Sequence, residues 1–190
     1  MKSLLWFAAA LALCCPLAFS QSSNPMARDL NRQLTLVENE VVPAAEAMPA
    51  DKYDFAPSDT MGNFKGVRTF AQEVKHIAAS NYLMGAAVLG TDPPVKYEDN
   101  GPASIQGKDA IVKFLKDSFA YAHHAIDSVN PENALKPPGN GHRNTRLFEA
   151  AEIPVHTNDH YGQMVEYLRM NGIVPPASVG SAPANPGKHE

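Results

Sequence analysis

The stretch His156-Thr-Asn-Asp-His160-Tyr-Gly-Gln163-Met-Val-Glu-Tyr-Leu-Arg-Met-Asn-Gly172 predicts a helix with a defined end. We expect it to run from about Val155 to Met170, because Asn171-Gly172 is a typical helix stop. His156 and His160 are four residues apart, so they lie one turn apart on the same side of the helix. Two imidazoles at this spacing can hold one transition-metal ion, although the spacing also arises by chance.

Three upstream segments repeat apolar residues at spacings of three and four, as amphipathic helices do. We expect helices at about 27–48, from 64 or 66 to 89, and at 108–129, with the fourth helix beginning near Arg146. The chain has no run of β-type alternation and no internal repeat. These features predict an all-α fold, a four-helix bundle.

Prolines and loops refine this prediction. Pro43 should kink the first helix or end it early, and Pro154 should bend the fourth just before its His pair. The loop from Thr91 to Lys108 is long, so the second and third helices need not be adjacent antiparallel neighbours. Tyr53 and Phe55, in an earlier loop, should plug one end of the core.

The first 20 residues have the features of a signal peptide. Lys2 supplies a short positive region, Leu4 to Phe19 is apolar and uncharged, and Ala18-Phe-Ser20 offers small residues before a cleavage site. The run is short for a membrane span. Leu13 before Cys14 argues against a lipidation site. We therefore expect an exported protein, periplasmic or secreted, without stable membrane insertion.

Composition limits what the remaining chain can do. Cys14 and Cys15 lie in the predicted signal peptide, so a metal site must use His, carboxylate and water. Residues 21–176 suffice for one domain, and the Pro/Gly/Ala-rich residues 177–190 predict a disordered tail. Lys2 is the one charge in residues 1–20, so removing them changes the net charge from −4 to −5. This mild acidity argues against nucleic acid as a partner.

Two histidines seldom complete a metal site, so a third ligand should come from another helix. On the residues alone, His76 on the second helix and His123 or His124 on the third are candidates. His142 lies in a loop and is a weaker candidate.

Three blocks of sequence bear on this choice: Ala45-Glu-Ala-Met-Pro-Ala-Asp-Lys-Tyr-Asp-Phe, Val67-Arg-Thr-Phe-Ala-Gln-Glu-Val-Lys-His76-Ile-Ala-Ala-Ser-Asn81, and His156-Thr-Asn-Asp-His160-Tyr-Gly-Gln. Together they resemble the DinB-like family, bacterial metal-binding four-helix proteins, over residues 29–178. The resemblance implies that His76, His156 and His160 bind a divalent metal ion, whereas the histidines of the third helix match no ligand position. Neutral imidazoles suit Zn, Ni, Fe or Cu, so the metal's identity stays open.

Helical geometry predicts the setting of such a site. His156 and His160 lie roughly opposite Val165, and His76 lies away from the apolar stripe of its own helix. We therefore expect a solvent-open groove between helices rather than the deepest core. Because ligand imidazoles must be neutral, metal should leave below about pH 6.

Catalytic residues are not identified by the sequence. Gln163, one turn beyond His160, is a candidate hydrogen-bonding partner for a bound water or substrate. Asp159 is a candidate general base, although a solvated carboxylate is the simpler interpretation. Glu73 and Asn81 are weaker candidates.

The sequence therefore leaves several functions possible. Characterised DinB-like relatives include transferases that join small cytosolic thiols to electrophiles, which fits poorly with export. We expect a metal-dependent hydrolase or transferase acting on a small molecule; the alternative is a non-catalytic metal-binding or interaction domain. His156-x-x-Asp159-His160 also approaches the inverted zincin pattern of peptidases, with Glu166 as the available further ligand. A homodimer is compatible with the resemblance, but no residue pattern requires one.

Overall fold

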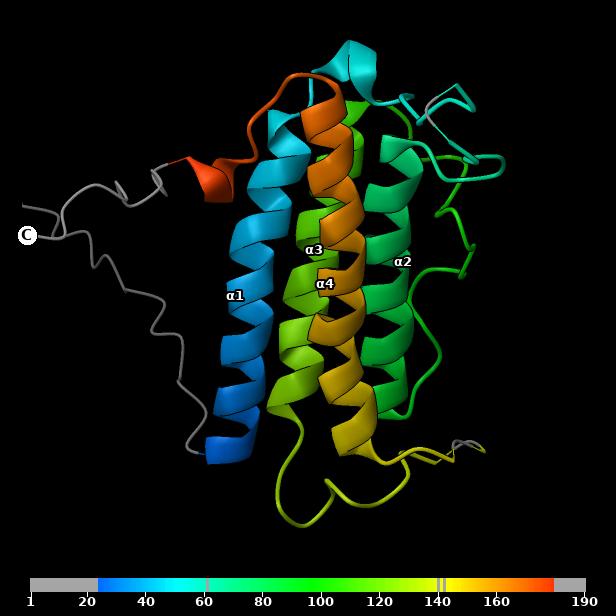
Figure 1. Ribbon diagram of the computed structural model, residues 1–190. Helices are drawn as coiled ribbons and strands as arrows, with labels where there is room; N and C mark the ends of the chain where they lie inside the picture. The colour runs from blue at the N-terminus through cyan, green and yellow to red at the C-terminus, as the bar shows by residue number, and fades with distance from the viewer. Residues whose placement is uncertain (1–23, 61, 140, 142, 180–190) are drawn as a thin grey trace, which may run out of the picture.

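The computed structural model describes residues 24–179 except Met61, Asn140 and His142. The elements in this part of the chain are α1 (Pro25–Ala47), η1 (Ala50–Lys52), α2 (Phe70–Leu89), α3 (Lys108–Asp127), α4 (Arg146–Met170) and η2 (Pro176–Ser178). The four α-helices stand side by side, and the described residues contain no strand (Figure 1). The predicted all-α four-helix bundle is confirmed. The predicted signal peptide lies outside the described residues.

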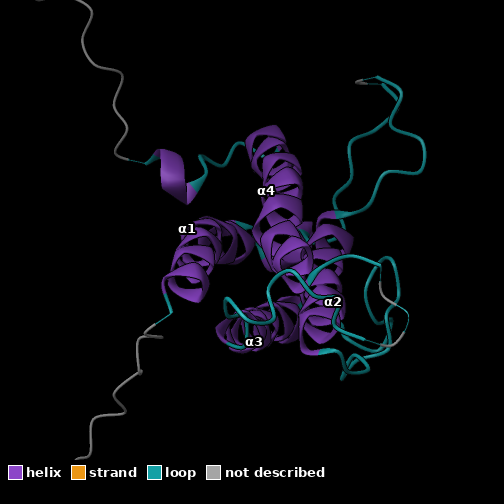
Figure 2. Ribbon diagram, turned by 90° about the horizontal axis from the view of Figure 1, so that it is seen from below, coloured by secondary structure: helices purple, strands orange, loops and turns teal. Residues whose placement is uncertain are grey.

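The helices run in an up-down-down-up order. The end of α1 meets the start of α3, where the Glu46 carbonyl accepts a hydrogen bond from Lys108 Nζ at 2.6 Å, so α1 and α3 are antiparallel. The loop between Gly90 and Gly107 climbs the length of the bundle and makes α2 and α3 parallel neighbours (Figure 1). Seen from one end, the order around the bundle is α1, α4, α2, α3 (Figure 2). None of the described helices is long and apolar enough to cross a bilayer.

Capping residues decide where α2 begins and ends. The side chain of Thr69 accepts from the Gln72 backbone N–H, and the Gln72 side chain accepts from the Thr69 backbone N–H, a capping box. The helix therefore starts at Phe70, and the predicted start at residue 64 or 66 is wrong. Its end is as predicted, because Gly90 adopts a left-handed conformation with φ 73°.

One proline expectation and one boundary need correction. α1 continues through Pro43 to Ala47, so of the two alternatives for Pro43 the early end is wrong. α4 also continues through Pro154, and the expected kink at Pro43 and bend at Pro154 stay predictions. Both helices are held by burial of neighbouring apolar residues, which outweighs the lost backbone hydrogen bond. At the other end, Ala177 and Ser178 belong to η2, so the predicted tail cannot begin at Ala177.

The expected plug at one end of the core is present. Tyr53 is buried, donates its hydroxyl to the Ala45 carbonyl at 2.7 Å, and packs edge-on against Phe70 with ring centroids 5.3 Å apart. Phe55 packs in the same way against Tyr167. These rings close the core at the end of the bundle where α2 begins and α4 ends.

Candidate metal centre

One face of α4 is buried along most of its length. Its residues follow the three-and-four spacing of a core-facing stripe: Ala150, Ile153, Thr157, His160, Met164 and Tyr167. His160 is thus a member of the buried stripe. Val165, used above as the reference for the apolar side, is only half-buried.

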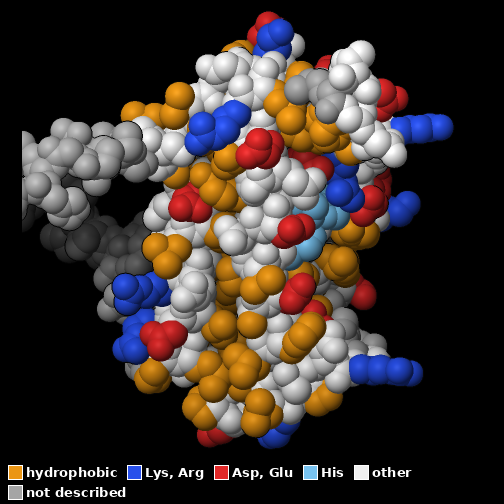
Figure 3. Space-filling model, viewed as in Figure 1, with side chains coloured by type: hydrophobic (Ala, Val, Ile, Leu, Met, Phe, Trp, Pro, Cys, Tyr) orange, Lys and Arg blue, Asp and Glu red, His pale blue; other side chains and the backbone are white. Residues whose placement is uncertain are grey.

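α2 is buried on most of its circumference, because it packs against both α3 and α4. Glu73, His76 and Ser80, spaced by three and four, make a buried polar row on it. His76 is 5% exposed and His160 7% exposed, while His156 is partly buried. The expected solvent-open groove is therefore wrong. Figure 3 shows histidine side chains reaching the surface in a narrow seam between α4 and α2, beside acidic and basic side chains.

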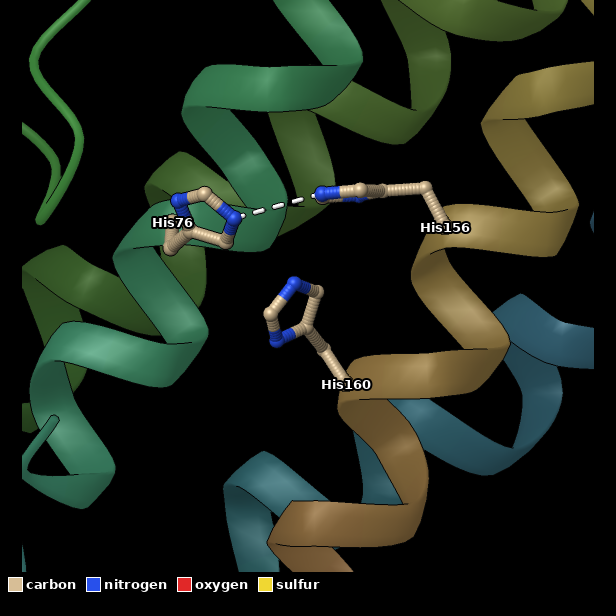
Figure 4. A group of neighbouring side chains, drawn as sticks. All are labelled: His76, His156 and His160. Carbon is tan, nitrogen blue, oxygen red and sulfur yellow. Dashed lines mark hydrogen bonds between the residues drawn. The ribbon is translucent and has the colours of Figure 1, made fainter. Parts of the chain in front are cut away.

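The three histidine rings converge on one small space between α2 and α4 (Figure 4). Nε2 of His76 lies 3.2 Å from Nε2 of His156. The ring centroids of His76 and His160 are 4.5 Å apart, and those of His156 and His160 are 4.6 Å apart. One ring nitrogen from each of the three lies within 4.8 Å of the others, so this cluster could hold a metal ion.

Two of the rings have their tautomer set by the protein. His76 Nδ1 contacts the main-chain carbonyl of Asp99, and His160 Nδ1 lies 2.8 Å from Oε2 of Glu73. A carbonyl or carboxylate oxygen can only accept, so each Nδ1 carries the proton and donates it. The Nε2 atoms of both neutral rings are therefore left with free lone pairs. Metal-ligating histidines are held in this way in proteins generally.

The geometry fits a metal ion. Two nitrogens bound to one tetrahedral zinc ion at 2.0–2.1 Å would lie about 3.3 Å apart. The observed separation between the Nε2 atoms of His76 and His156 is 3.2 Å. With a metal bound, His156 would carry its proton on Nδ1, which is buried and has no hydrogen-bond partner among the described residues. Three imidazoles would leave a coordination position for water or substrate.

Burial makes the charged forms of the His156 and His76 rings unfavourable. It lowers the pKa of His156 from 6.5 to about 4, with the neighbouring His160 and His76 rings contributing less. Burial also lowers the pKa of His76, although its hydrogen bond to the Asp99 carbonyl opposes this. Neutral imidazole is the form that binds metal, so the setting favours ligation near neutral pH.

Glu73 holds the His160 ring, a role that the sequence did not predict. Its side chain is 2% exposed, and Arg68 Nη1 lies 3.9 Å from its Oε1. It acts on His160 from the side of the ring that faces away from the other two histidines. The available signal was its position one turn before His76 on the same helix, a Glu-x-x-His spacing that places both side chains on one face.

The other candidates lie around the cluster. The Gln163 amide nitrogen is 3.2 Å from His160 Nδ1, the nitrogen that also meets Glu73. Asp159 is exposed on α4. Asn81 is fully buried and bridges Thr157 and Ser118 through hydrogen bonds of 3.3 and 3.2 Å. A role for Gln163 or Asp159 in a reaction stays a prediction.

The remaining histidines stand apart from the cluster. His123 joins α3 to α1 through Asn31 and Glu38, and His124 is exposed. His142 lies outside the described residues. Glu166, the further ligand of the peptidase alternative, is exposed on α4. The side chain that meets the His pair is that of His76.

Comparison with known proteins agrees with this architecture. A search of curated proteins finds no match for the chain. A family model described as the DinB superfamily matches residues 33–164, well over half of the chain and a range that contains all three clustered histidines. The four-helix bundle and its histidine cluster thus belong to a member of the DinB superfamily.

Proposed function

We propose that His76, His156 and His160 hold a divalent transition-metal ion, Zn, Ni or Fe, and that this ion serves a hydrolytic or group-transfer reaction on a small molecule. The observation that carries the proposal is the convergence of three imidazoles from two helices, with Nε2 of His76 and His156 3.2 Å apart. Membership of the DinB superfamily supports it.

The residues around the cluster would orient the ligands, and the metal ion would supply the chemistry. His76 and His160 present Nε2 because the Asp99 carbonyl and the Glu73 carboxylate hold their Nδ1 protons. A bound divalent cation supplies Lewis acidity, which polarises a carbonyl and lowers the pKa of a bound water or thiol. The buried positions of His76 and His160 keep most water away, which strengthens electrostatic interactions at the site.

Metal content tests the first half of the proposal. Protein prepared without a His tag is analysed for metals as wild type and as His76→Ala, His160→Ala and His124→Ala. His124 is exposed on α3 and serves as the matched control. We expect equimolar metal in the wild type and in His124→Ala, and little in the other two. Equal metal content in all four proteins would contradict the proposal.

Turnover tests the second half. The metal-loaded wild type is assayed on a panel of esters, amides and pairs of thiols with electrophiles. We expect turnover of one of these classes, lost in His160→Ala and retained in His124→Ala. A protein that binds metal at the three histidines but turns over no member of the panel would instead be a non-catalytic metal-binding domain.

Export of the mature chain from residue 21 is part of this proposal, and N-terminal sequencing of the recovered protein checks it.

A further inference from the structure

The loop that joins α2 to α3 passes beside the histidine cluster and contributes to it. The main-chain carbonyl of Asp99, in the middle of this loop, accepts the Nδ1 proton of His76. The Nδ1 atom of His160 is held by Glu73 of α2, whereas the Nδ1 atom of His76 is held by a segment without regular structure. The orientation of this ring therefore depends on where the loop lies.

The loop is held against α2 and the residues just before it by contacts at Asp99, Asn100 and Pro102. Arg68 Nη2 lies 2.8 Å from Asp99 Oδ2, and Arg68 Nε donates to Asn100 Oδ1 at 3.0 Å. Lys75 Nζ donates to the Pro102 carbonyl at 3.1 Å. The main chain of Arg68 is also held, since its carbonyl accepts the hydroxyl proton of Tyr167 at 3.0 Å. The Asp99 carboxylate is exposed, but its Oδ1 lies 3.7 Å from His76 Nδ1, the nitrogen that the Asp99 carbonyl also contacts, so the side chain and the main chain of Asp99 both lie against this ring.

Close contact leaves this segment little room to shift. Gly101 has a φ of 70°, and a Cβ placed on it would lie 2.3 Å from Lys75 Cβ. No side chain fits at that separation, so the loop main chain lies directly on α2. The neighbouring Glu98 is also exposed, and its described hydrogen bond uses only its main-chain carbonyl. The two adjacent acidic residues thus differ in whether their side chains hold the loop.

We propose that Asp99 is a positioning residue for the metal ligand His76, and that metal binding is coupled through it to the order of the loop around residues 97–102. This inference rests on the proposed metal site. A loop anchored by the Arg68–Asp99 pair keeps the His76 ring turned toward the other two histidines. Coupling is reciprocal, so a bound metal ion stabilises the loop by the same free energy by which the ordered loop favours metal.

Three variants test whether Asp99 acts by anchoring the loop or by its negative charge. Asp99→Ala removes the anchor, Asp99→Asn keeps an oxygen that accepts from Arg68 but loses the charge, and Glu98→Ala removes a charge from the same loop without touching the anchor. Zn²⁺ affinity of the full-length metal-free protein is measured by competition with a chromophoric chelator. We expect Asp99→Ala to weaken binding by about tenfold or more, and the other two to stay close to the wild type. Circular dichroism checks that all variants are folded.

Hydrogen exchange supplies the second readout. The Gly101 amide, bonded to the Glu98 carbonyl, and the Ile105 amide, bonded to the Pro102 carbonyl, report loop order. We expect Zn²⁺ to slow their exchange in the wild type and in Glu98→Ala, but much less in Asp99→Ala. Asp99→Asn binding Zn²⁺ as weakly as Asp99→Ala, or equal behaviour of Asp99→Ala and Glu98→Ala, would overturn the positioning role and leave the metal site standing. A wild type that binds no metal would overturn both proposals.

Discussion

Glu73 shows how much of this site depends on a residue that contacts a proposed metal ligand without being one itself. Its carboxylate is enclosed between α2 and α4, 2.8 Å from His160 Nδ1 and 3.9 Å from Arg68 Nη1. An enclosed carboxylate is costly unless hydrogen bonds compensate for its lost hydration. The contact with His160 provides that compensation and orients the ring. The charge of the carboxylate also strengthens Nε2, on the other side of the ring, as a metal ligand.

We therefore expect Glu73→Gln to bind metal about 10- to 100-fold more weakly than the wild type. The amide can still accept from His160 Nδ1, so the fold should survive while the charge that strengthens the ligand is lost. Competition with a chelator measures the affinity, and Glu166→Gln, at an exposed position on α4, is the matched control. An unchanged affinity in Glu73→Gln would show that the carboxylate does not tune the ligand.

A second expectation at this scale concerns pH. Burial lowers the pKa of His156 from 6.5 to about 4 in the folded protein. As pH falls from about 6.5, the unfolded chain takes up this proton and the folded chain does not, so stability falls, and this contribution levels off below pH 4. Thermal unfolding of the metal-free protein between pH 7 and 3.5 measures the loss, which we expect to be shallower in His156→Gln. Parallel pH profiles for the two proteins would contradict this.

Among the elements, α2 departs most from what its sequence pattern predicts. A single apolar stripe was expected on it, yet Glu73, His76 and Asn81 are buried as well as the apolar residues. Helical periodicity identifies one core-facing side, whereas α2 touches two helices. Its start was also misplaced, because the reciprocal side-chain bonds between Thr69 and Gln72 outweigh the apolar residues upstream. The third helix, which has one buried side, matched its predicted stripe.

Two glycines within helices allow the effect of close packing on stability to be measured separately from the effect of helix propensity. A Cβ on Gly85 of α2 would lie 2.9 Å from the Tyr121 ring of α3, whereas one on Gly162 of α4 would meet nothing within 4 Å. We expect Gly162→Ala to raise the free energy of unfolding by about 0.5–1 kcal/mol. Gly85→Ala should lower it, since the ring must move away from its packing against Tyr82. Urea unfolding measures both, and equal gains would refute the close-packing argument.

For the whole molecule, the local pattern predicted four helices but could not predict their directions. The long loop after α2 allowed either direction for α3, and the observed direction is fixed by contacts such as that between Lys108 at the start of α3 and Glu46 at the end of α1, which no local pattern encodes. The membership of the histidine cluster was predictable through the family resemblance, since His76 lies 80 residues before His156. Its burial was not, because burial depends on how α2, α4 and the crossing loop pack together.

The position of the cluster makes a metal ion a link between α2 and α4, and this has a consequence for global stability. A ligand that binds only the folded state at 100 times its dissociation constant stabilises it by about 2.7 kcal/mol. For a domain of this size that corresponds to a rise of roughly 5–10 °C in the midpoint of thermal unfolding. We expect this rise when Zn²⁺ is added to the metal-free wild type and to His124→Ala, whose altered residue is exposed on α3. His160→Ala should show almost none, because it lacks one of the two α4 imidazoles that face His76. A similar rise in His160→Ala would mean that Zn²⁺ stabilises the protein from another place, and that the three rings pack together without binding metal.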